Sequence, residues 1–363
     1  MSNLLGRNFR IMTFGESHGP ALGVVIDGLP AGLRLPREAI QADLDRRRPG
    51  LSPYVSPRRE PDEVEILSGL SAEGRTNGAP LALLIRNRDA RGKDYEDLRH
   101  RFRPGQSDWP YFIKYGLKPQ PGGGRSSGRE TVARVAAGAV ARQMLSPLGL
   151  KAQAYAVAVG RVKAENHDPD FAETDPLRFA DRELAPKACQ EVEAAVSEGD
   201  SVGAVVEVRV TGVPAGWGEP VFGKLEAALG GAFFSIGAVR AVEFGEGLTM
   251  SAQRGSEAND PLGSDGPVTN RHGGIMGGLS TGLPIVARLH VRPTPSIARE
   301  QHSVTVDGRP TTISTTGRHD PCLAPRLAPV AEAMALITLA DFHLEPNRHY
   351  IAINQSALAE GSQ

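Results

Sequence analysis

The clearest hydrophobic pattern in the chain follows a glycine-rich turn at residues 122–124. Small apolar residues recur there at helical spacing and share one face of a helix: Val132, Val135, Ala136 and Ala139. Ser127 and Glu130 precede this run with the spacing of a capping box. The pattern predicts a helix that begins close to Ser127, directly after glycines that allow the backbone to approach a ligand closely.

The same patterning predicts other elements along the chain. Apolar runs bounded by turn residues predict strands at 22–27, 63–67, 80–87, 204–210 and 283–291. Helices are predicted at 36–48, 191–197, 220–232 and 330–340. The helix at 330–340 is apolar nearly all round, so we expect it to be buried. We expect a surface excursion at 166–186, which is polar, and a mobile loop at 86–100, which is highly charged.

The segment Gly15–Gly32 has an echo in Gly199–Gly216, and the two align without a gap. Each copy has a polar loop, a predicted strand, a Pro-Ala-Gly turn and a predicted helix. Self-similarity of this kind marks repeated structure. We therefore predict two related halves, with pseudo-repeats starting near residues 15 and 199, within one domain spanning 1–363. Chance similarity between glycine-rich segments is the alternative.

Composition narrows the class of protein. The chain has 363 residues, 40% of them hydrophobic, and a net charge of −1, which argues against bulk attraction to nucleic acid or to a membrane surface. The two cysteines, Cys189 and Cys322, lie too far apart for a zinc motif, so no metal site is predicted. The N-terminus has no apolar segment of the secretory type. We expect a cytoplasmic protein that does not enter membranes.

Arginines gather in several short clusters, which suits a small anionic ligand bound through bidentate contacts. Arg125 and Arg129 flank the predicted helix start, where free N–H groups favour anions. Arg47 and Arg48 end the helix at 36–48; either they complement the helix dipole or they hold a phosphate or carboxylate. A solvated surface is the alternative for any one cluster.

Two further groups are candidates for chemistry. His18 occupies a position where the second copy has Val202, so the shared scaffold does not require an imidazole there. Histidine titrates near neutrality and can act as a general acid or base. The sequence Arg318-His319-Asp320 lies just before the predicted buried helix. It is either a site at the mouth of that helix or an N-terminal cap with an ion pair.

Together these stretches resemble the chorismate synthase family, from about Gly6 to Phe342. The resemblance rests on FGESHGPALG with VIDGLPAG, on GGGRSSGRETVARVAAGAVA and on GRHDPCLAPRLAPVAEAM, supported by DLDRRRPG and RREPDEVEILSG. It implies an α+β fold, a β-α-β sandwich with two internally related halves, assembled as a homotetramer. It also implies conversion of 5-enolpyruvylshikimate 3-phosphate to chorismate by a 1,4-anti elimination of phosphate. That reaction requires reduced FMN but has no net redox change.

The resemblance also assigns roles to residues. It makes His18 the proton donor to the departing phosphate and places Asp320 near the flavin N5, where it would help to move a proton. It places Arg47, Arg48 and Arg129 in an anion pocket for substrate, which is also linked to NADP. The implied FMN contacts are Arg125, Ser126, Ser127, Gly237, Ala238, Gly277, Arg292, Pro293, Thr294, Pro295, Ser296 and Arg318.

The sequence departs from the family pattern on the expected flavin face. Gln106 stands where the family usually has a histidine, and glutamine cannot titrate. Losing one acid–base group typically costs ~10²–10⁴ in rate. Gly237 replaces an asparagine, and Arg271-His272 replaces a histidine-alanine pair, so His272 is a candidate substitute for the missing histidine. Pro53 stands where some relatives carry an arginine.

Three interpretations follow from this pattern. The chain is a chorismate synthase with a modified flavin pocket, a diverged paralogue that performs a flavin-dependent elimination on a related phosphorylated cyclic acid, or a non-catalytic scaffold that binds anions. His18, Arg125, Arg318 and Asp320 speak against the third, and Gln106 and Gly237 against an unmodified first. Since no reductase-like domain is visible, we expect an external flavin reductase to supply reduced FMN.

Overall fold

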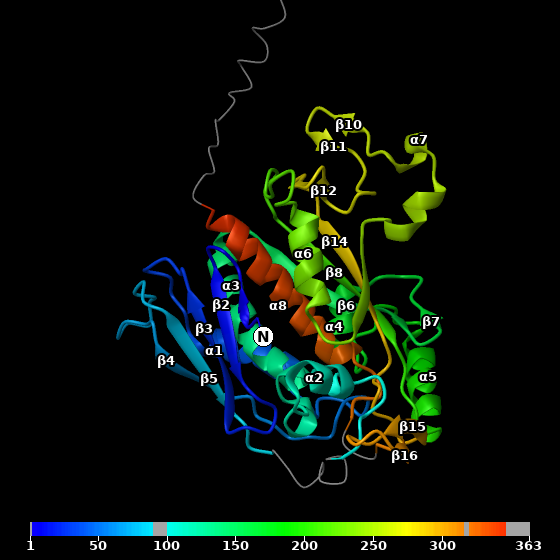
Figure 1. Ribbon diagram of the computed structural model, residues 1–363. Helices are drawn as coiled ribbons and strands as arrows, with labels where there is room; N and C mark the ends of the chain where they lie inside the picture. Colours follow the sequence, from blue (N-terminus) through cyan, green and yellow to red (C-terminus); the bar gives the residue numbers. More distant parts are fainter. Residues whose placement is uncertain (1, 90–99, 316–318, 346–363) are drawn as a thin grey trace, which may run out of the picture.

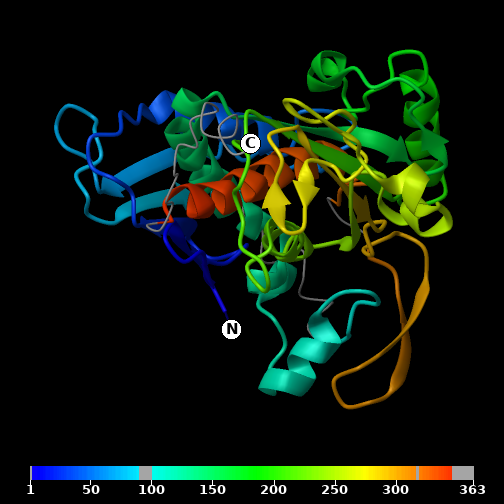
Figure 2. The same ribbon diagram turned by 90° about the horizontal axis from the view of Figure 1, so that it is seen from above.

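The computed structural model describes residues 2–89, 100–315 and 319–345. Two five-stranded sheets enclose a layer of helices, which gives an α+β fold of the β-α-β sandwich type (Figure 1). This confirms the predicted fold class. Seen from above, α2 and the β15–β16 hairpin project from one side of the sandwich (Figure 2).

The first sheet has the order β1-β2-β3-β5-β4, and every pairing in it is antiparallel. Its strands are β1 (Leu4–Leu5), β2 (Arg10–Gly15), β3 (Ala21–Asp27), β4 (Val64–Ser68) and β5 (Leu81–Arg86). The second sheet has the order β7-β6-β8-β14-β9 and is likewise antiparallel throughout. Its strands are β6 (Lys151–Val159), β7 (Val162–Lys163), β8 (Ala204–Thr211), β9 (Val239–Phe244) and β14 (Ile285–Val291).

Four helices fill the space between the sheets: α1 (Arg37–Arg47), α3 (Thr131–Leu145), α6 (Leu225–Phe234) and α8 (Ala324–His343). α3 packs on β3 and β5 of the first sheet, and α8 packs on β6 and β8 of the second. The helices outside this layer are α2 (Asp108–Tyr115), α4 (Pro169–Thr174), α5 (Ala185–Ser197) and α7 (Gly255–Ala258). Among the described residues, no helix combines the length and the apolar character needed to cross a bilayer.

The remaining elements are short. The two-stranded hairpins are β10 (Leu262–Gly263) with β11 (Gly266–Pro267), β12 (Ile275–Met276) with β13 (Leu279–Ser280), and β15 (Gln301–Val304) with β16 (Pro310–Ile313). The 3-10 turns are η2 (Pro121–Ser126), η3 (Gly128–Glu130), η4 (Ser146–Leu148) and η5 (Gly247–Ala252).

The sequence echo corresponds to equivalent places in the two sheets. β3 lies at the centre of the first sheet and β8 at the centre of the second. The glycine after each strand has a positive φ, 92° at Gly28 and 78° at Gly212. A Cβ would lie 1.9 Å from the Asn8 carbonyl oxygen at Gly28 and 2.3 Å from the Gly149 carbonyl oxygen at Gly212. The same backbone constraint therefore closes the central strand of both halves.

Several predicted boundaries differ from the observed ones. The helix predicted at 220–232 begins only at Leu225, because residues 219–223 close a turn through the Glu219–Gly223 bridge. The predicted capping box forms only in part: Ser127 Oγ accepts the Arg129 N–H, whereas the Glu130 carboxylate bonds Thr13 and Arg134 instead. The α-helix itself starts at Thr131.

The prediction that residues 166–186 form a surface excursion is wrong in part. Although most of the segment is polar, it contains three apolar residues with no exposed surface, Leu177, Phe179 and Ala180. Phe179 forms a parallel bridge with Ala156 of β6, so the segment packs along the second sheet. Of the charged loop predicted at 86–100, residues 90–99 lie outside the described residues.

α3 and α8 approach each other closely at the middle of the sandwich. A Cβ at Gly138 of α3 would lie 2.3 Å from the Cβ of Ala333 on α8. Real Cβ atoms do not come that close, so the crossing requires glycine at this position. Both helices are lined by alanine around the contact and are buried there. The glycine thus sets how tightly the two halves close on each other.

A buried carboxylate ties the same helices together at their outer edge. Glu332 of α8 is 1% exposed and accepts hydrogen bonds from Arg46 of α1 and Arg142 of α3 at 2.7 and 2.8 Å. Its other oxygen accepts the Ala154 N–H of β6 at 2.9 Å. One side chain thereby joins three helices to the second sheet. A buried carboxylate is stable in this position only because every lone pair has a donor nearby.

Substituting Gly138 with alanine should destabilise the protein, because the new methyl overpacks the α3–α8 contact, an effect of typically ~1–3 kcal/mol. The same change at Gly231 of α6 is a matched control, since a Cβ there meets no atom within 4 Å. Gly231→Ala should stabilise the fold by about 0.5–1 kcal/mol through helix propensity. Urea unfolding of both variants measures the difference, and equal effects of the same sign would contradict the packing argument.

Candidate functional site

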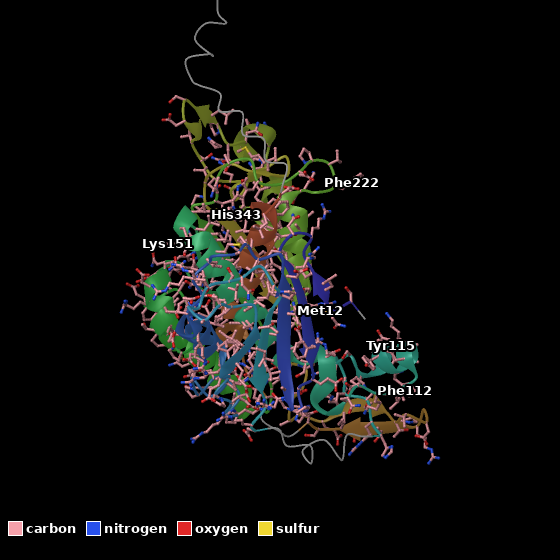
Figure 3. All side chains as sticks on the ribbon, turned by 90° about the vertical axis from the view of Figure 1, so that its left-hand side faces the viewer. Met12, Phe112, Tyr115, Lys151, Phe222 and His343 are labelled. Carbon is pink, nitrogen blue, oxygen red and sulfur yellow. The ribbon has the colours of Figure 1, made fainter. Side chains whose placement is uncertain are left out.

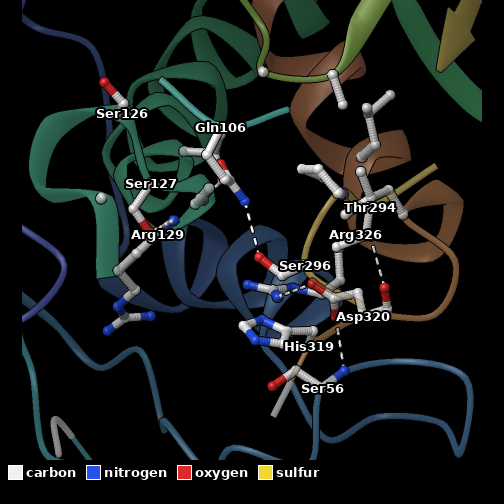
Figure 4. Close-up of a pocket in the computed structure, with 18 of the residues that line it drawn as sticks. Ser56, Gln106, Ser126, Ser127, Arg129, Thr294, Ser296, His319, Asp320 and Arg326 are labelled. Atoms are coloured by element: carbon white, nitrogen blue, oxygen red, sulfur yellow. Dashed lines mark hydrogen bonds and ion pairs between the residues drawn. The ribbon is translucent and has the colours of Figure 1, made fainter. Parts of the chain in front are cut away.

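A cavity of about 400 Å³ opens where α3 and α8 begin. Segments far apart in sequence converge on it, as Figure 4 shows for part of its wall. They are the loop at 49–60, the turn at 103–106, the glycine-rich turn at 122–129, residues 236–240 after α6, residues 292–296 after β14, and residues 319–330 at the start of α8. Helix N-termini present free N–H groups and a partial positive charge, which favour anions.

The glycine-rich turn can form only with glycine. Gly122, Gly123 and Gly124 have φ values of 73°, 95° and 52° in succession. A Cβ at Gly122 would lie 2.3 Å from His18 Cε1 and 2.7 Å from Ser17 Oγ. The turn therefore lies directly against the Ser17–His18 pair, and Gly122 and Gly123 form part of the cavity wall.

The cavity wall is strongly cationic. Its charged residues are Arg58, Arg103, Arg129, Arg240, Arg292 and Arg326, with the carboxylates of Glu60 and Asp320. Three guanidinium nitrogens are buried without a hydrogen-bond partner among the described residues: Arg58 Nε, Arg129 Nη2 and Arg326 Nε. Arg129 Nη2 still lies 3.7 Å from Glu60 Oε2. Six guanidinium groups against two carboxylates around one cavity indicate a place for an anion.

Arg129 is held in place by a buried charge network beneath the cavity. Its guanidinium bonds the Asp62 carboxylate, and Asn87 Oδ1 accepts its Nε–H at 3.0 Å. Asp62 also accepts from Arg47 Nη1 at 2.9 Å. Arg47 and Asp62 have no exposed surface. Complete burial, with the nearby Arg326, lowers the pKa of Arg47, and Asp62 opposes that shift.

Arg103 is oriented in a similar way from the other side. Asp108, at the start of α2, accepts Arg103 Nε–H at 2.8 Å and Nη2–H at 2.7 Å, a bidentate pair. Burial alone would raise the pKa of Asp108, but the Arg103 guanidinium outweighs it and lowers the pKa. The pair stays ionised and fixes one guanidinium in the wall.

Asp320 is engaged at both oxygens. Oδ1 accepts the Ser56 N–H at 2.7 Å and Oδ2 accepts from Arg326 Nη1 at 2.7 Å. Thr294 Oγ1 donates to the Asp320 carbonyl oxygen at 2.8 Å. His319, its neighbour, also lines the cavity (Figure 4). Burial, then the charge on Arg103, lowers the pKa of His319, and Asp320 offsets this only in part.

Gln106 lies opposite this group and donates from Nε2 to Ser296 Oγ at 3.0 Å (Figure 4). The remaining wall is apolar and includes Ile236, Leu323, Leu327 and Val330. A Cβ on Gly237 would meet no atom within 4 Å, so this residue leaves open space. Ala238 next to it has φ 76°, a conformation that costs an alanine energy and recurs at functional sites.

The structure gathers most of the site residues expected from sequence at this cavity. Those lining it are Gln106, Ser126, Ser127, Arg129, Gly237, Ala238, Arg292, Thr294, Pro295, Ser296 and Asp320. Arg47 lies beneath the wall through Asp62 and also donates from Nε to Thr131 Oγ1, a wall residue, at 3.2 Å. Arg318 lies outside the described residues.

The other expected residues do not line the cavity. His18 lies behind Gly122, with Nδ1 2.7 Å from Ser17 Oγ. Arg125 donates to the Thr13 side chain and to the Gly15 carbonyl oxygen, which anchors the glycine turn to β2. Arg48 pairs with Asp45 at 3.7 Å. Pro293 and Gly277 are also absent from the wall, and Gly277 forms the turn between β12 and β13.

His272 does not stand in for a histidine at this cavity. Its Nδ1 lies 2.8 Å from Asp260 Oδ2, and the residue belongs to the segment between β11 and β12. The sequence reasoning also missed Arg240 and Arg326, which lie in the wall without belonging to an arginine cluster. Arg58 and Arg103 did belong to clusters, but nothing in the sequence separated them from solvated neighbours.

The wall fits a small ligand that is anionic in part. The guanidinium groups of the wall can receive phosphate or carboxylate oxygens, and another part of the wall is apolar. A volume near 400 Å³ is within the usual range of small-molecule sites.

Comparisons with known proteins agree along nearly the whole chain. The family model described as chorismate synthase matches residues 9–344. A chorismate synthase from Syntrophobacter fumaroxidans is 52% identical over 341 residues, 94% of this chain and 97% of that protein. One from Porphyromonas gingivalis is 48% identical over 352 residues, 94% of this chain and 95% of that protein. A crystal structure of chorismate synthase has a TM-score of 0.73 and 29% identity, covering 93% of this chain and 92% of that one. The chain belongs to the chorismate synthase family.

Proposed function

We propose that this chain converts 5-enolpyruvylshikimate 3-phosphate to chorismate by a 1,4-anti elimination of phosphate that depends on reduced FMN. Family membership supports the reaction class. The observation that carries the proposal is the set of guanidinium groups of Arg58, Arg103, Arg129, Arg240, Arg292 and Arg326 around one cavity. The substrate carries one phosphate and two carboxylates, which are the groups that guanidinium binds best.

The arginines would also stabilise the reaction. Negative charge grows on the phosphate oxygens as the carbon–oxygen bond breaks, and preoriented donors favour that change. Arg129 is held by Asp62, and Arg326 by Asp320, so neither guanidinium must reorganise during the step. The N-terminal ends of α3 and α8 add to the same positive field.

The residues that would hold FMN are Ser126 and Ser127, the Gly237–Ala238 pair and the segment 292–296. The chemistry supplied by bound reduced FMN is electron density lent to the substrate ring and then recovered. Gln106 would be held beside it by Ser296. His18 would act on the departing phosphate from behind Gly122, together with Ser17. The anion pocket that includes Arg129 would also be the site that the family resemblance links to NADP.

A second candidate is an elimination on another phosphorylated cyclic acid. Two observations favour it: Gln106 is a hydrogen-bond donor that cannot titrate, and Gly237 leaves space that a side chain could fill. Both changes lie at the cavity wall, where they would alter the ligand that fits.

Incubating the purified protein anaerobically with photoreduced FMN and 5-enolpyruvylshikimate 3-phosphate should release phosphate and chorismate in equal amounts. Both products are followed in the same reaction. Boiled protein and oxidised FMN serve as controls. A flavin spectral change without chorismate would favour the second candidate, and no flavin binding at all would contradict both.

Arg240 tests the anion site separately. It lines the cavity, is exposed, and has no carboxylate partner in the described ranges. Arg240→Gln should weaken binding of substrate or inorganic phosphate about fivefold, the effect of ~1 kcal/mol from an exposed charge pair. Arg34→Gln is the control, because Arg34 is equally exposed but lies away from the cavity. Equal phosphate affinity in both variants, measured calorimetrically, would remove Arg240 from the site.

Assembly as a homotetramer is part of the proposal. An apolar stripe covers the outer face of the first sheet, where Met12 and Phe14 of β2 and Leu4 of β1 are 49%, 39% and 58% exposed (Figure 3). Leu4 and Met12 are direct cross-strand partners. Met12→Glu should reduce the oligomer mass measured by light scattering, because it puts a charge into the proposed contact. A mass equal to that of the unmodified protein would exclude this face as the interface.

A further inference from the structure

One amide side chain behind the cavity wall contacts two groups to which the proposed function gives different roles. Asn87 follows directly after β5, and its N–H donates to the Pro20 carbonyl oxygen at 3.0 Å. This bond extends the pairing of β5 with β3 by one residue. It places Asn87 beside the turn that connects β2 to β3, which carries Ser17 and His18.

The Asn87 amide holds both ends of that turn. Its Nδ2 donates to the carbonyl oxygens of Glu16 at 3.1 Å and of Gly19 at 2.7 Å. The Gly19 N–H also donates to the Glu16 carbonyl oxygen at 3.1 Å, which closes the turn around Ser17 and His18. The position of the His18 ring therefore depends on two main-chain oxygens that one side chain binds.

The oxygen of the same amide contacts Arg129. Asn87 Oδ1 accepts the Arg129 Nε–H at 3.0 Å, and Arg129 lines the cavity. Turning the amide over would set its NH₂ against the guanidinium N–H and its oxygen against two carbonyl oxygens, so the partners allow one orientation only. Aspartate has nearly the same shape but lacks the two donor hydrogens. The contacts on both sides therefore require asparagine.

The residues after Asn87 fix it to the same wall. The N–H groups of Arg88 and Asp89 donate to Glu60 Oε2 at 2.9 Å and to Glu60 Oε1 at 3.2 Å. Glu60 lines the cavity, has almost no exposed surface and pairs with Arg58 at 2.8 Å. Three successive residues are thus bonded to the groups around the cavity, which gives the Asn87 amide a firm base.

We infer that Asn87 is a positioning residue that sets the place of His18 relative to Arg129. The inference rests on the proposed function, in which His18 acts on the departing phosphate and Arg129 binds that phosphate. Their separation must then be held while the carbon–oxygen bond breaks. A misplacement of about 1 Å in such an arrangement can cost on the order of 10² in rate. Asn87 does not line the cavity, so it acts through these two residues.

Asn87→Ala tests the inference, with Asn8→Ala as the matched control. Asn8 is also partly buried and donates from Nδ2 to a main-chain carbonyl oxygen, that of Asp341, but it does not line this cavity. Asn87→Ala should lower kcat of the FMN-loaded enzyme on the order of 10²-fold. It should also weaken binding of inorganic phosphate, measured calorimetrically, about tenfold, because Arg129 loses a charge-assisted hydrogen bond. Asn8→Ala should leave both values within about twofold of the unmodified protein.

Double variants separate positioning from a general loss of stability. In an Arg129→Gln background, Asn87→Ala should change phosphate affinity by no more than about twofold, because its effect acts through that guanidinium. In a His18→Ala background it should lower kcat by less than about tenfold, because the ring that it positions is gone. A loss of stability would have the same effect in every background. Asn87→Asp keeps the acceptor but lacks the donors; it should also lose turnover, and it replaces the alanine variant if that does not fold.

The outcomes distinguish this inference from the proposed function. An unmodified enzyme that makes no chorismate would overturn the proposed function, and the phosphate measurements would still test the link between Asn87 and Arg129. An active enzyme whose Asn87 variants keep their full kcat would overturn this inference alone. Additive losses in the double variants would do the same, because they would show that Asn87 does not act through His18 or Arg129.

Discussion

The contact between α3 and α8 at Gly138 and Ala333 is the constraint on which the rest of this structure depends. Because Gly138 has no Cβ to meet the Cβ of Ala333, the helix backbones come close enough for the sheets to close over them. Each helix carries one sheet on its outer side. Their N-terminal ends consequently open at one place, where residues from both halves of the chain meet.

The packing of α3 against α8 also brings together the charged side chains around the cavity. Asp62 and Asp320 are each tied to an arginine of the wall, and a further arginine, Arg47, is buried beneath it. These pairs fix the direction of the guanidinium groups but leave some of their nitrogens without an acceptor. An anionic ligand would complete the network. In the proposed function, ligand binding and folding therefore use the same set of charges.

Much of the fold was predictable from the sequence because the local hydrophobic patterns and the tertiary packing favour the same elements. The apolar period after Ser127 and the run at 330–340 gave the two central helices, since buried helices need long apolar faces. The apolar runs at 22–27 and 204–210 gave the two central strands, and a glycine with positive φ follows each of them. The motif resemblance led to the cavity because glycine and serine loops are distinctive in sequence.

The rest depended on tertiary contacts that no local pattern records. The start of α6 was misplaced because Pro220 looks like a helix start, while a turn through Gly223 takes precedence. Leu177 and Phe179 are buried by the second sheet although their neighbours are polar. Arg240 and Arg326 stand alone in sequence and join the site only after folding.

The most direct test of the central claim is a crystal structure of the protein grown with FMN and inorganic phosphate. We expect phosphate within hydrogen-bond distance of Arg129 and Arg326, between the first turns of α3 and α8, with the flavin ring beside Gly237. Phosphate bound elsewhere, or a cavity closed by protein side chains with no room for the ring, would contradict the account.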